Sequence, residues 1–211
     1  MKPSMKLAVL AAAALTLLAG GCGAAKNDPK GAPAPKAEAA APAKAAPAGD
    51  KKMLIVYWSL SGGNTKRIAD ALQQATGADM EALELVTPYS GSYDDITAQG
   101  KREVDEGFKP VLKPLRYEPE DYDVIAVGTP TWWYTMSPAV LSFLTAHDWT
   151  GKTVIPFQTH AGWPGHCLDD MQAACAGADF VQPLQVKFDH QTLVSPQSDI
   201  DGWLAGVKTV L

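Results

Sequence analysis

The stretch that most constrains the fold of this chain is residues 53–69, MLIVYWSLSGGNTKRIA. It begins with an apolar run from Met53 to Trp58, which is bounded by two Lys residues before it and by Ser59 after it. A short continuous apolar run of this kind is typical of a central parallel strand covered on both faces. The Ser- and Gly-rich turn and the helix start that follow bring backbone N–H groups and a helix N-terminus to one point, where a phosphate can bind.

The first 21 residues resemble an export signal. Two Lys residues near the start are followed by a thirteen-residue apolar run over residues 7–19 and then by small residues before Cys22. This run is too short for a stable membrane span, and its order fits a cleaved signal peptide. The sequence Leu-Ala-Gly-Gly-Cys also resembles the lipobox of bacterial lipoproteins, and an ordinary secretory signal is the alternative. We therefore expect cleavage after residue 21 and a lipid on Cys22.

Residues 22–52 are predicted to be a disordered tether between this lipid and a folded domain at residues 53–211. After Cys22 the segment consists mainly of Ala, Pro, Lys and Gly, with no aromatic residue and no Val, Ile or Leu. It cannot bury enough apolar surface to offset its chain entropy. We expect the domain to lie outside the cytoplasm at the bacterial cell envelope, on the periplasmic face, and to meet the membrane only through the lipid.

The charge of the chain is divided unevenly between tether and domain. Residues 23–52 carry six Lys and three acidic residues, a net charge of +3, whereas residues 53–211 carry ten Lys or Arg and twenty Asp or Glu, a net charge of −10. An acidic domain disfavours nucleic acid and anionic lipid headgroups as partners. Its charge favours solubility, and the alternative is electrostatic attraction of a basic protein partner.

Strand and helix patterns alternate five times along the domain. Strands are predicted at residues 53–58, 80–86, 121–127, 153–157 and 178–186. Helices are predicted at residues 64–76, 168–176 and 199–210, after Ser137-Pro138, and as one solvated helix at 93–106. This alternation predicts a parallel sheet with helices on both sides, in which Pro156 is awkward unless it ends its strand. Ligands of such sheets bind beyond the carboxyl ends of the strands, where the loops 59–65, 129–137 and 158–166 should meet.

These three loops carry complementary ligand groups. The first offers hydroxyl, amide and backbone N–H donors but no Lys of the kind that a nucleoside triphosphatase requires, so it favours a bound monophosphate. A plain strand–helix turn is the alternative. The second loop holds Trp132, Trp133 and Tyr134, and the third holds Trp163. Because consecutive Trp residues cannot both point one way, at least one is expected to face a ligand or partner.

The motifs YWSLSGGNT at 57–65, VGTPTWW at 127–133 and GKTVIPF with THAG at 151–162 resemble those of flavodoxin-like proteins, in particular a subgroup with a Trp-Trp pair after the third strand. The resemblance covers residues 53–211. It implies an α/β fold of three layers, with a five-stranded parallel sheet in the order 2-1-3-4-5, that binds FMN non-covalently. The implied contacts to the FMN phosphate are Ser59, Ser61, Gly62, Gly63, Asn64 and Thr65. The implied contacts to its ring system are Pro130, Thr131, Trp132, Trp133, Tyr134, Thr159, His160, Ala161 and Gly162.

Two departures from the family pattern bear on this site. The usual first turn reads Ser-x-Ser/Thr-Gly-Asn-Thr, whereas Gly62-Gly63 adds one residue, which leaves open which N–H groups meet the phosphate. The third loop of the family is commonly rich in Gly and Ser, whereas this chain has Trp163-Pro164 there. These residues either stiffen the loop or cover the edge of the flavin.

Three functions are compatible with these features. We favour an FMN-dependent electron carrier for a protein partner; its acidic surroundings should lower the reduction potential of the flavin. The alternatives are an NAD(P)H-dependent quinone reductase and a binding lipoprotein without flavin. Metal binding is not predicted, because Cys167 and Cys175 are too few ligands for a site. Eight residues along one helix also place them about 12 Å apart, so both are expected to be free thiols.

Overall fold

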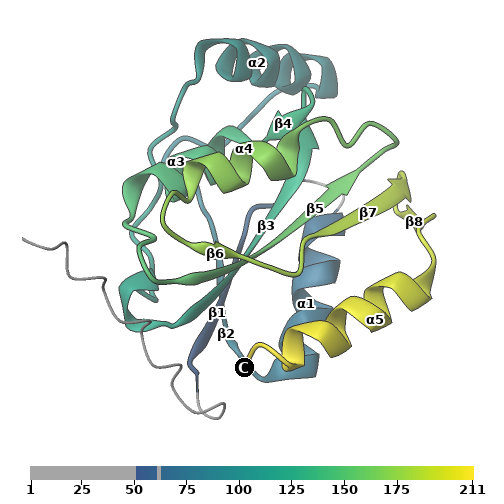
Figure 1. Cartoon of the computed structure of the whole chain (residues 1–211). Helices are drawn as coiled ribbons and strands as arrows, with labels where there is room; N and C mark the ends of the chain where they lie inside the picture. The colour runs from purple at the N-terminus through teal and green to yellow at the C-terminus, as the bar shows by residue number, and fades with distance from the viewer. Residues whose placement is uncertain (1–50, 61–62) are drawn as a thin grey trace, which may run out of the picture. The chain divides into compact units, whose positions relative to one another are not determined.

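Five parallel strands form the centre of the computed structural model, which describes residues 51–60 and 63–211 (Figure 1). They are β1 (Met53–Tyr57), β2 (Asp79–Ala82), β3 (Val124–Trp132), β5 (Thr153–His160) and β7 (Leu184–Asp189). Their order is β2-β1-β3-β5-β7, and each adjacent pair is parallel. The predicted fold class and strand order are therefore confirmed. The predictions for the export signal, the tether before Lys51, Cys22, Ser61 and Gly62 fall outside the described residues.

Three two-residue strands extend this sheet. The antiparallel partner of the end of β3 is β4 (Thr135–Met136), and that of the end of β7 is β8 (Thr192–Leu193). The third, β6 (Asp179–Phe180), runs parallel to the start of β5. The segment predicted as a loop at residues 129–137 is therefore largely extended, since it includes the end of β3 and all of β4.

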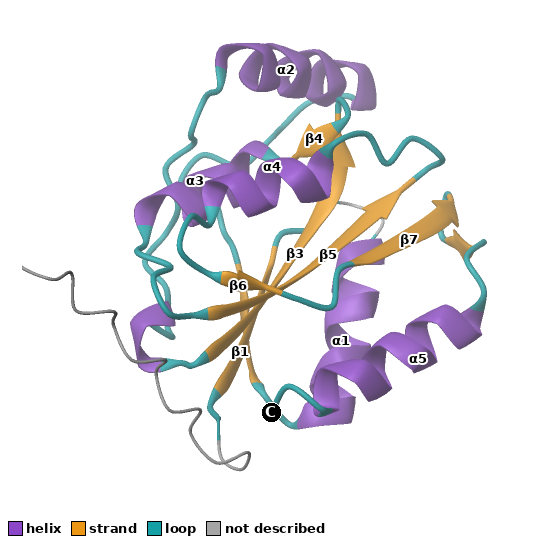
Figure 2. Ribbon diagram, viewed as in Figure 1, coloured by secondary structure: helices purple, strands orange, loops and turns teal. Residues whose placement is uncertain are grey.

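Helices cover both faces of the sheet (Figure 2). On one face lie α1 (Asn64–Thr76) and α5 (Gln197–Lys208), and on the other lie α3 (Pro138–Ala146) and α4 (Cys167–Ala174). The remaining helix, α2 (Tyr93–Glu106), packs against the end of β3 and against α3, and a 3₁₀ turn spans Pro119–Asp121. Within the described residues, no helix has both the length and the apolar character that crossing a membrane requires.

The alternation of side chains along β1 explains its continuous apolar sequence. Leu54 and Val56 join the core under α3 and α4, whereas Met53, Ile55 and Tyr57 join the core under α1 and α5. A strand buried on both faces has no position left for a polar side chain. The carboxyl ends of β1, β3 and β5 are thereby fixed side by side at one edge of the sheet.

The second predicted strand is shorter than expected. Its pairing with β1 ends at Ala82, and the chain then turns to pair with the segment around Leu112. The Val86 N–H donates to Val111 O at 2.9 Å, and the Lys113 N–H donates to Glu84 O at 2.8 Å. The first part of the predicted strand at 80–86 thus pairs with β1, and its second part pairs with the segment at 111–113. One continuous apolar pattern does not show where the pairing changes.

The fifth predicted strand, at residues 178–186, is divided into β6 and β7. Between them stand Gln182, whose φ is 51°, and Pro183, which has no N–H to donate. Pro156 lies within β5 rather than at its end, in the interval where pairing with β6 has stopped and pairing with β7 has not begun. An interrupted ladder of this kind accommodates a residue without an N–H.

The predicted helices exist, with small differences in their ends. The bounds of α1 and α2 are as predicted, whereas α4 and α5 begin one or two residues earlier and end two residues earlier than predicted. The description of α2 as a solvated helix was wrong, because Gly100 and Glu103 on its inner face are buried. A capping box between Ser92 and Asp95 explains where α2 begins.

Candidate functional site

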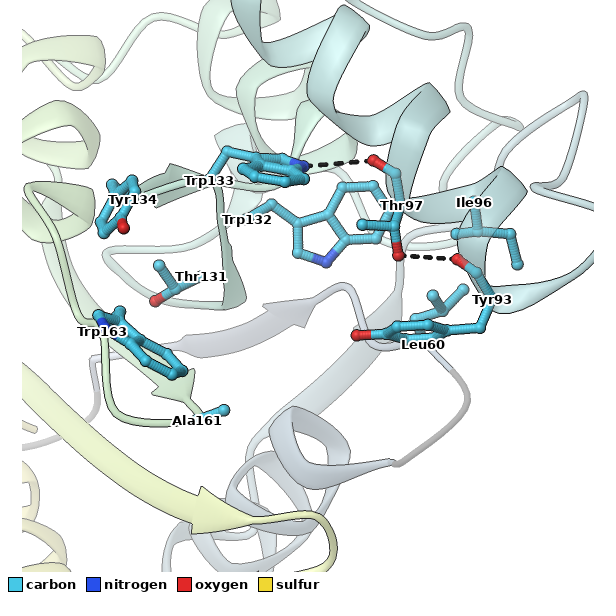
Figure 3. Close-up of a pocket in the computed structure, with 10 residues that line it drawn as sticks. All are labelled: Leu60, Tyr93, Ile96, Thr97, Thr131, Trp132, Trp133, Tyr134, Ala161 and Trp163. Carbon is cyan, nitrogen blue, oxygen red and sulfur yellow. Dashed lines mark hydrogen bonds between the residues drawn. The ribbon is translucent and has the colours of Figure 1, made fainter.

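A cavity of about 370 Å³ opens beyond the carboxyl ends of β1, β3 and β5 (Figure 3). Its volume lies within the range of small-molecule sites. Aromatic side chains dominate the walls, and three elements contribute them: the β3–β4 hairpin, the start of α2 and the loop after β5. The lining residues are Leu60, Tyr93, Ile96, Thr97, Thr131, Trp132, Trp133, Tyr134, Ala161 and Trp163.

The β3–β4 hairpin has an unusual turn at its tip. Trp132 pairs with Thr135, so Trp133 and Tyr134 form a two-residue turn, and their φ angles are 49° and 71°. Two positive φ angles are what a type I′ hairpin turn requires, and Asn or Gly usually supplies them. Large aromatic residues in this conformation are strained, and such strain persists only where neighbouring structure holds it.

The two Trp side chains of this hairpin both extend toward α2 but differ in burial (Figure 3). Trp132 packs inward, with ring centroids 5.0 Å from Trp58 and 5.1 Å from Tyr89. A Cβ atom at Gly100 would lie 2.6 Å from Cζ3 of Trp132, so α2 can approach this ring only because residue 100 is Gly. Trp132 is therefore a rigid wall of the cavity.

Trp133 lies nearer the surface and is 42% exposed. Its indole Nε1 donates to the Thr97 carbonyl of α2 at 3.3 Å, and the Lys101 ammonium lies 5.5 Å from its ring centroid. The second Trp is thus held against α2 while one face stays accessible. Both Trp rings line the cavity.

The loop after β5 rests on the hairpin turn. The His166 N–H donates to Tyr134 O at 2.8 Å. A Cβ atom at Gly165 would lie 2.1 Å from Tyr134 O, so no side chain fits there. Between these contacts and Ala161, the Trp163 side chain projects to the cavity and is 67% exposed. The second and third predicted loops therefore form one continuous aromatic surface.

The start of α1 is the remaining part of the predicted site. Gly63 has a φ of 67° and precedes the helix. Among residues 51–60 and 63–211 no side chain caps the first turn, and that turn holds no acidic residue. The Asn64 side-chain amide donates to His190 O at 2.7 Å, which links this end of α1 to the β7–β8 turn. The backbone N–H groups of the first turn are thus available to an anion.

Several predicted contact residues have structural bonds of their own. The Thr65 and Thr159 hydroxyls are buried and lie 2.8 Å apart, which joins α1 to β5. The Gly162 N–H donates to Nδ1 of His160 at 3.0 Å. Burial and, to a smaller degree, Lys187 lower the pKa of His160 below its ordinary value of 6.5. His160, Pro130, Thr159 and Gly162 are not among the cavity-lining residues, although all four stand at its edge of the sheet.

The main residues that sequence reasoning missed belong to α2. Tyr93, Ile96 and Thr97 line the cavity, and Gly100 packs beneath Trp132. These positions are spaced by three or four residues, so they share one face of a helix. That spacing is visible in the sequence, but the charged residues around it gave the impression of a fully solvated helix.

Metal and thiol chemistry have little support in the described residues. At positions 51–60 and 63–211, no group of three or more His, Cys, Asp or Glu side chains is placed to hold a metal ion. Cys167 and Cys175 are free and buried, as expected, and burial raises the pKa of each thiol to about 12. A thiol with so high a pKa is a poor nucleophile at neutral pH.

Three solved structures illustrate the similarity of this chain to known proteins. A protein from Bacteroides uniformis has a TM-score of 0.63 at 21% identity, covering 74% of this chain and 99% of its own. A protein from Bacteroides eggerthii has a TM-score of 0.60 at 23% identity, covering 75% and 98%. A flavoprotein from Lactobacillus acidophilus, solved in complex with FMN, has a TM-score of 0.56 at 20% identity, covering 73% and 99%.

These likenesses concern the fold, because all three identities lie below 25%. No curated protein matches the chain. A family model described as flavodoxin matches residues 52–193, which is about two thirds of the chain and includes all three loops of the cavity. The chain belongs to the flavodoxin family.

Proposed function

We propose that this protein binds FMN non-covalently at the aromatic cavity and exchanges electrons with a protein partner. The observation that carries the proposal is the position of the cavity. Its aromatic walls lie at the same edge of the sheet as the first turn of α1, which holds no acidic residue. A flat ring system between the walls and a phosphate at the helix N-terminus would use both features.

The residues present fit such a ligand. Thr131 Oγ1 is buried at the cavity beside the Cys167 thiol, and a thiol is a weak hydrogen-bond partner. A polar atom of a bound ring would bond this hydroxyl more strongly. The first turn of α1 offers backbone N–H groups without an acidic side chain to repel a phosphate. Gly63, with its positive φ, lets the backbone bend at this point.

Two comparisons support FMN in preference to another flat ligand. The family model described as flavodoxin spans the loops that form the cavity. The Lactobacillus acidophilus flavoprotein of similar fold was solved with FMN bound. Support for FMN thus comes from the family and from the donor groups of the cavity, and the two agree.

Bound FMN would supply the redox chemistry, while the side chains of this chain bind and orient it. Trp132 is fixed by Trp58 and Gly100, so it can hold a ring in place without rearranging. Trp133 and Trp163 can shield one edge of the ring from water. The surrounding acidic charge disfavours additional negative charge on the ring and so favours a low reduction potential.

The exposed rim of the cavity favours exchange with a second molecule. Tyr93, Tyr134 and Trp163 are 78%, 53% and 67% exposed around its mouth. We infer that a redox protein, attracted through its basic residues by the acidic domain, approaches this rim. A nicotinamide or quinone could stack on the same rim, which keeps the NAD(P)H-dependent quinone reductase as the second candidate.

A spectrum of the purified protein, recorded with and without added FMN, tests cofactor binding. We expect about one FMN per chain, and Trp132→Ala should weaken binding strongly because it removes a cavity wall. Colourless protein that takes up no FMN would contradict the proposal and favour a flavin-free binding lipoprotein. Steady oxidation of NADH or NADPH with a quinone would favour the reductase over the carrier.

We further propose that the domain is held at the cell envelope by a lipid on Cys22. The support is the order of charged, apolar and small residues before Cys22 and the Ala- and Pro-rich segment after it. Labelling with a fatty acid in a bacterial host should mark the chain and leave Cys22→Ser unlabelled. Equal labelling of both proteins, or none of the first, would contradict the proposal.

A further inference from the structure

Asp170 of α4 joins the two aromatic loops of the cavity without lining the cavity itself. Its Oδ2 atom accepts a hydrogen bond from the Thr135 hydroxyl, which follows the hairpin turn. The same oxygen lies 2.5 Å from Nδ1 of His166, the last residue of the loop after β5. One carboxylate oxygen therefore bonds both loops, and hydrogen bonds to a charged acceptor are stronger than those between neutral groups.

These bonds hold an arrangement that the backbone alone disfavours. The φ angles of Trp133 and Tyr134 are both positive, which is strained for aromatic residues. The hairpin turn packs against the loop at Gly165 and His166, whose backbone contacts Tyr134 directly. A strained turn keeps its conformation only while such contacts persist. The Asp170 carboxylate stabilises these contacts by bonding Thr135 of the hairpin and His166 of the loop.

We propose that Asp170 is a positioning residue that holds the hairpin turn and the loop after β5 in the arrangement that receives FMN. The proposal rests on the proposed function for its ligand, but the bracing of the two loops can be measured without FMN. The Asp169-Asp170 pair is otherwise a common feature of a helix start. Asp169 is exposed and its side chain makes none of the bonds described, so it is a matched control on the same turn of α4.

Hydrogen exchange on the full-length protein tests the bracing. In Asp170→Ala the amides of residues 133–135 and 161–166 should exchange faster than in the parent, while Asp169→Ala should leave them unchanged. The His166 amide is the most direct probe because its bond to Tyr134 O closes the contact between the loops. Unchanged exchange of both segments in Asp170→Ala overturns the proposal.

FMN titration of the same proteins tests the link to the ligand. We expect the dissociation constant of FMN to rise roughly tenfold in Asp170→Ala, since two hydrogen bonds to a partly exposed carboxylate are lost. The circular dichroism of bound flavin should also change, which a general loss of stability would not produce. Asp169→Ala should match the parent in both readouts, and faster exchange with unchanged affinity and dichroism would overturn the positioning role.

Two further variants separate the two arms of the network. Thr135→Val removes only the hairpin arm, and His166→Ala removes only the loop arm. Each single variant should show part of the change in amide exchange and FMN affinity that Asp170→Ala shows. Adding Asp170→Ala to the Thr135→Val/His166→Ala double variant should change these readouts little further. Asp170→Asn keeps the side-chain shape and replaces Asp170→Ala if the latter does not fold. If the parent takes up no FMN, the proposed function fails, and the exchange data alone decide whether Asp170 braces the loops.

Discussion

Gly165 and Tyr134 approach each other more closely than any side chain at position 165 would allow. The backbone of Gly165 has a φ of 60°, and an added Cβ would lie 2.1 to 2.6 Å from the Tyr134 backbone. The Tyr134 residue is itself in a left-handed conformation. Two left-handed residues thus meet at one contact, and the conformation is unfavourable only for Tyr134, because Gly adopts it freely. This contact sets the distance between the aromatic loops.

Gly165→Ala should therefore lower the free energy of unfolding by roughly 2 kcal/mol or more, because it adds both a steric clash and left-handed strain. Urea unfolding measures the change. Gly202→Ala is the matched control, since Gly202 lies on the exposed side of α5 with nothing within 4 Å of an added Cβ. That substitution should be neutral or stabilising by about 0.5–1 kcal/mol. Equal effects of the two substitutions would contradict the close contact.

His160 gives the loop after β5 a dependence on pH. Its Nδ1 atom accepts the Gly162 N–H, which only a ring unprotonated at that nitrogen can do. Since the pKa of His160 in the folded protein lies below its ordinary value of 6.5, the folded state binds fewer protons than the unfolded state as pH falls through this region. The stability associated with neutral His160 is therefore present above pH 6.5 and lost as pH falls toward and below its folded pKa.

We expect FMN affinity to fall in the same pH range, because protonated His160 releases Gly162. His160→Ala should bind FMN more weakly at pH 8 and lose the part of the pH dependence below 6.5 that the parent shows. Titrations with FMN between about pH 5 and 8 measure both effects. His147→Ala serves as the control for loss of a histidine, because His147 bonds to Glu120 and does not line the cavity. An unchanged pH profile in His160→Ala would contradict this role.

At the scale of elements, α1 is attached to the sheet at the point where its N-terminus faces the site. The Thr65 and Thr159 hydroxyls bond each other in a region closed to solvent. The family resemblance implies that Thr65 contacts the phosphate and Thr159 the ring. Their mutual bond indicates a further role, which is to orient α1 relative to β5.

Replacing one of these Thr residues by Val should cost about 1–2 kcal/mol of unfolding free energy, because the remaining hydroxyl is buried without its partner. Replacing both should cost less than the sum of the two single changes. Chemical unfolding of Thr65→Val, Thr159→Val and the double variant completes the cycle. Strictly additive costs would show that the two hydroxyls do not depend on each other.

The elements differ in how well their sequences predict them. The apolar run of β1 and the apolar spacing of α1 lead directly to the observed strand and helix, because each depends on its own residues and their period. The break between β6 and β7 depends on where Pro183 meets the ladder of β5, which is a tertiary property. The role of α2 in the cavity likewise depends on the contact between Gly100 and Trp132, 32 positions apart.

For the molecule as a whole, the parallel sheet and the edge that carries the site follow from the alternation of strands and helices, whereas the order of the strands was implied by the family resemblance. The side chains that line the cavity follow only in part. Trp132 and Tyr134 were predicted from their loop and Thr131 from the family resemblance, whereas Leu60 and Tyr93 required the three-dimensional arrangement. The network of Asp170 could not be predicted, because nothing in the sequence relates Thr135 to a residue 35 positions later.

The net charge of −10 on residues 53–211 acts on every molecule that approaches the domain. A protein loaded with FMN and chemically reduced should therefore react faster with a cationic metal complex at low salt than at high salt. The decrease should be roughly tenfold between about 0.01 and 1 M salt, over which the screening length falls from about 30 to 3 Å. An anionic complex should show the opposite trend, since salt relieves its repulsion.

Stopped-flow absorbance of the flavin measures these rates, and an uncharged quinone is the control because its rate should hardly depend on salt. For each acceptor, the slope of the logarithm of the rate constant against ionic strength is compared. Differences in driving force among the three acceptors therefore do not affect the comparison. If the cationic and anionic acceptors respond to salt alike, the acidic charge does not reach the exposed rim at Tyr93, Tyr134 and Trp163. A basic partner would then gain no electrostatic advantage at this cavity, and recognition would have to depend on the aromatic side chains.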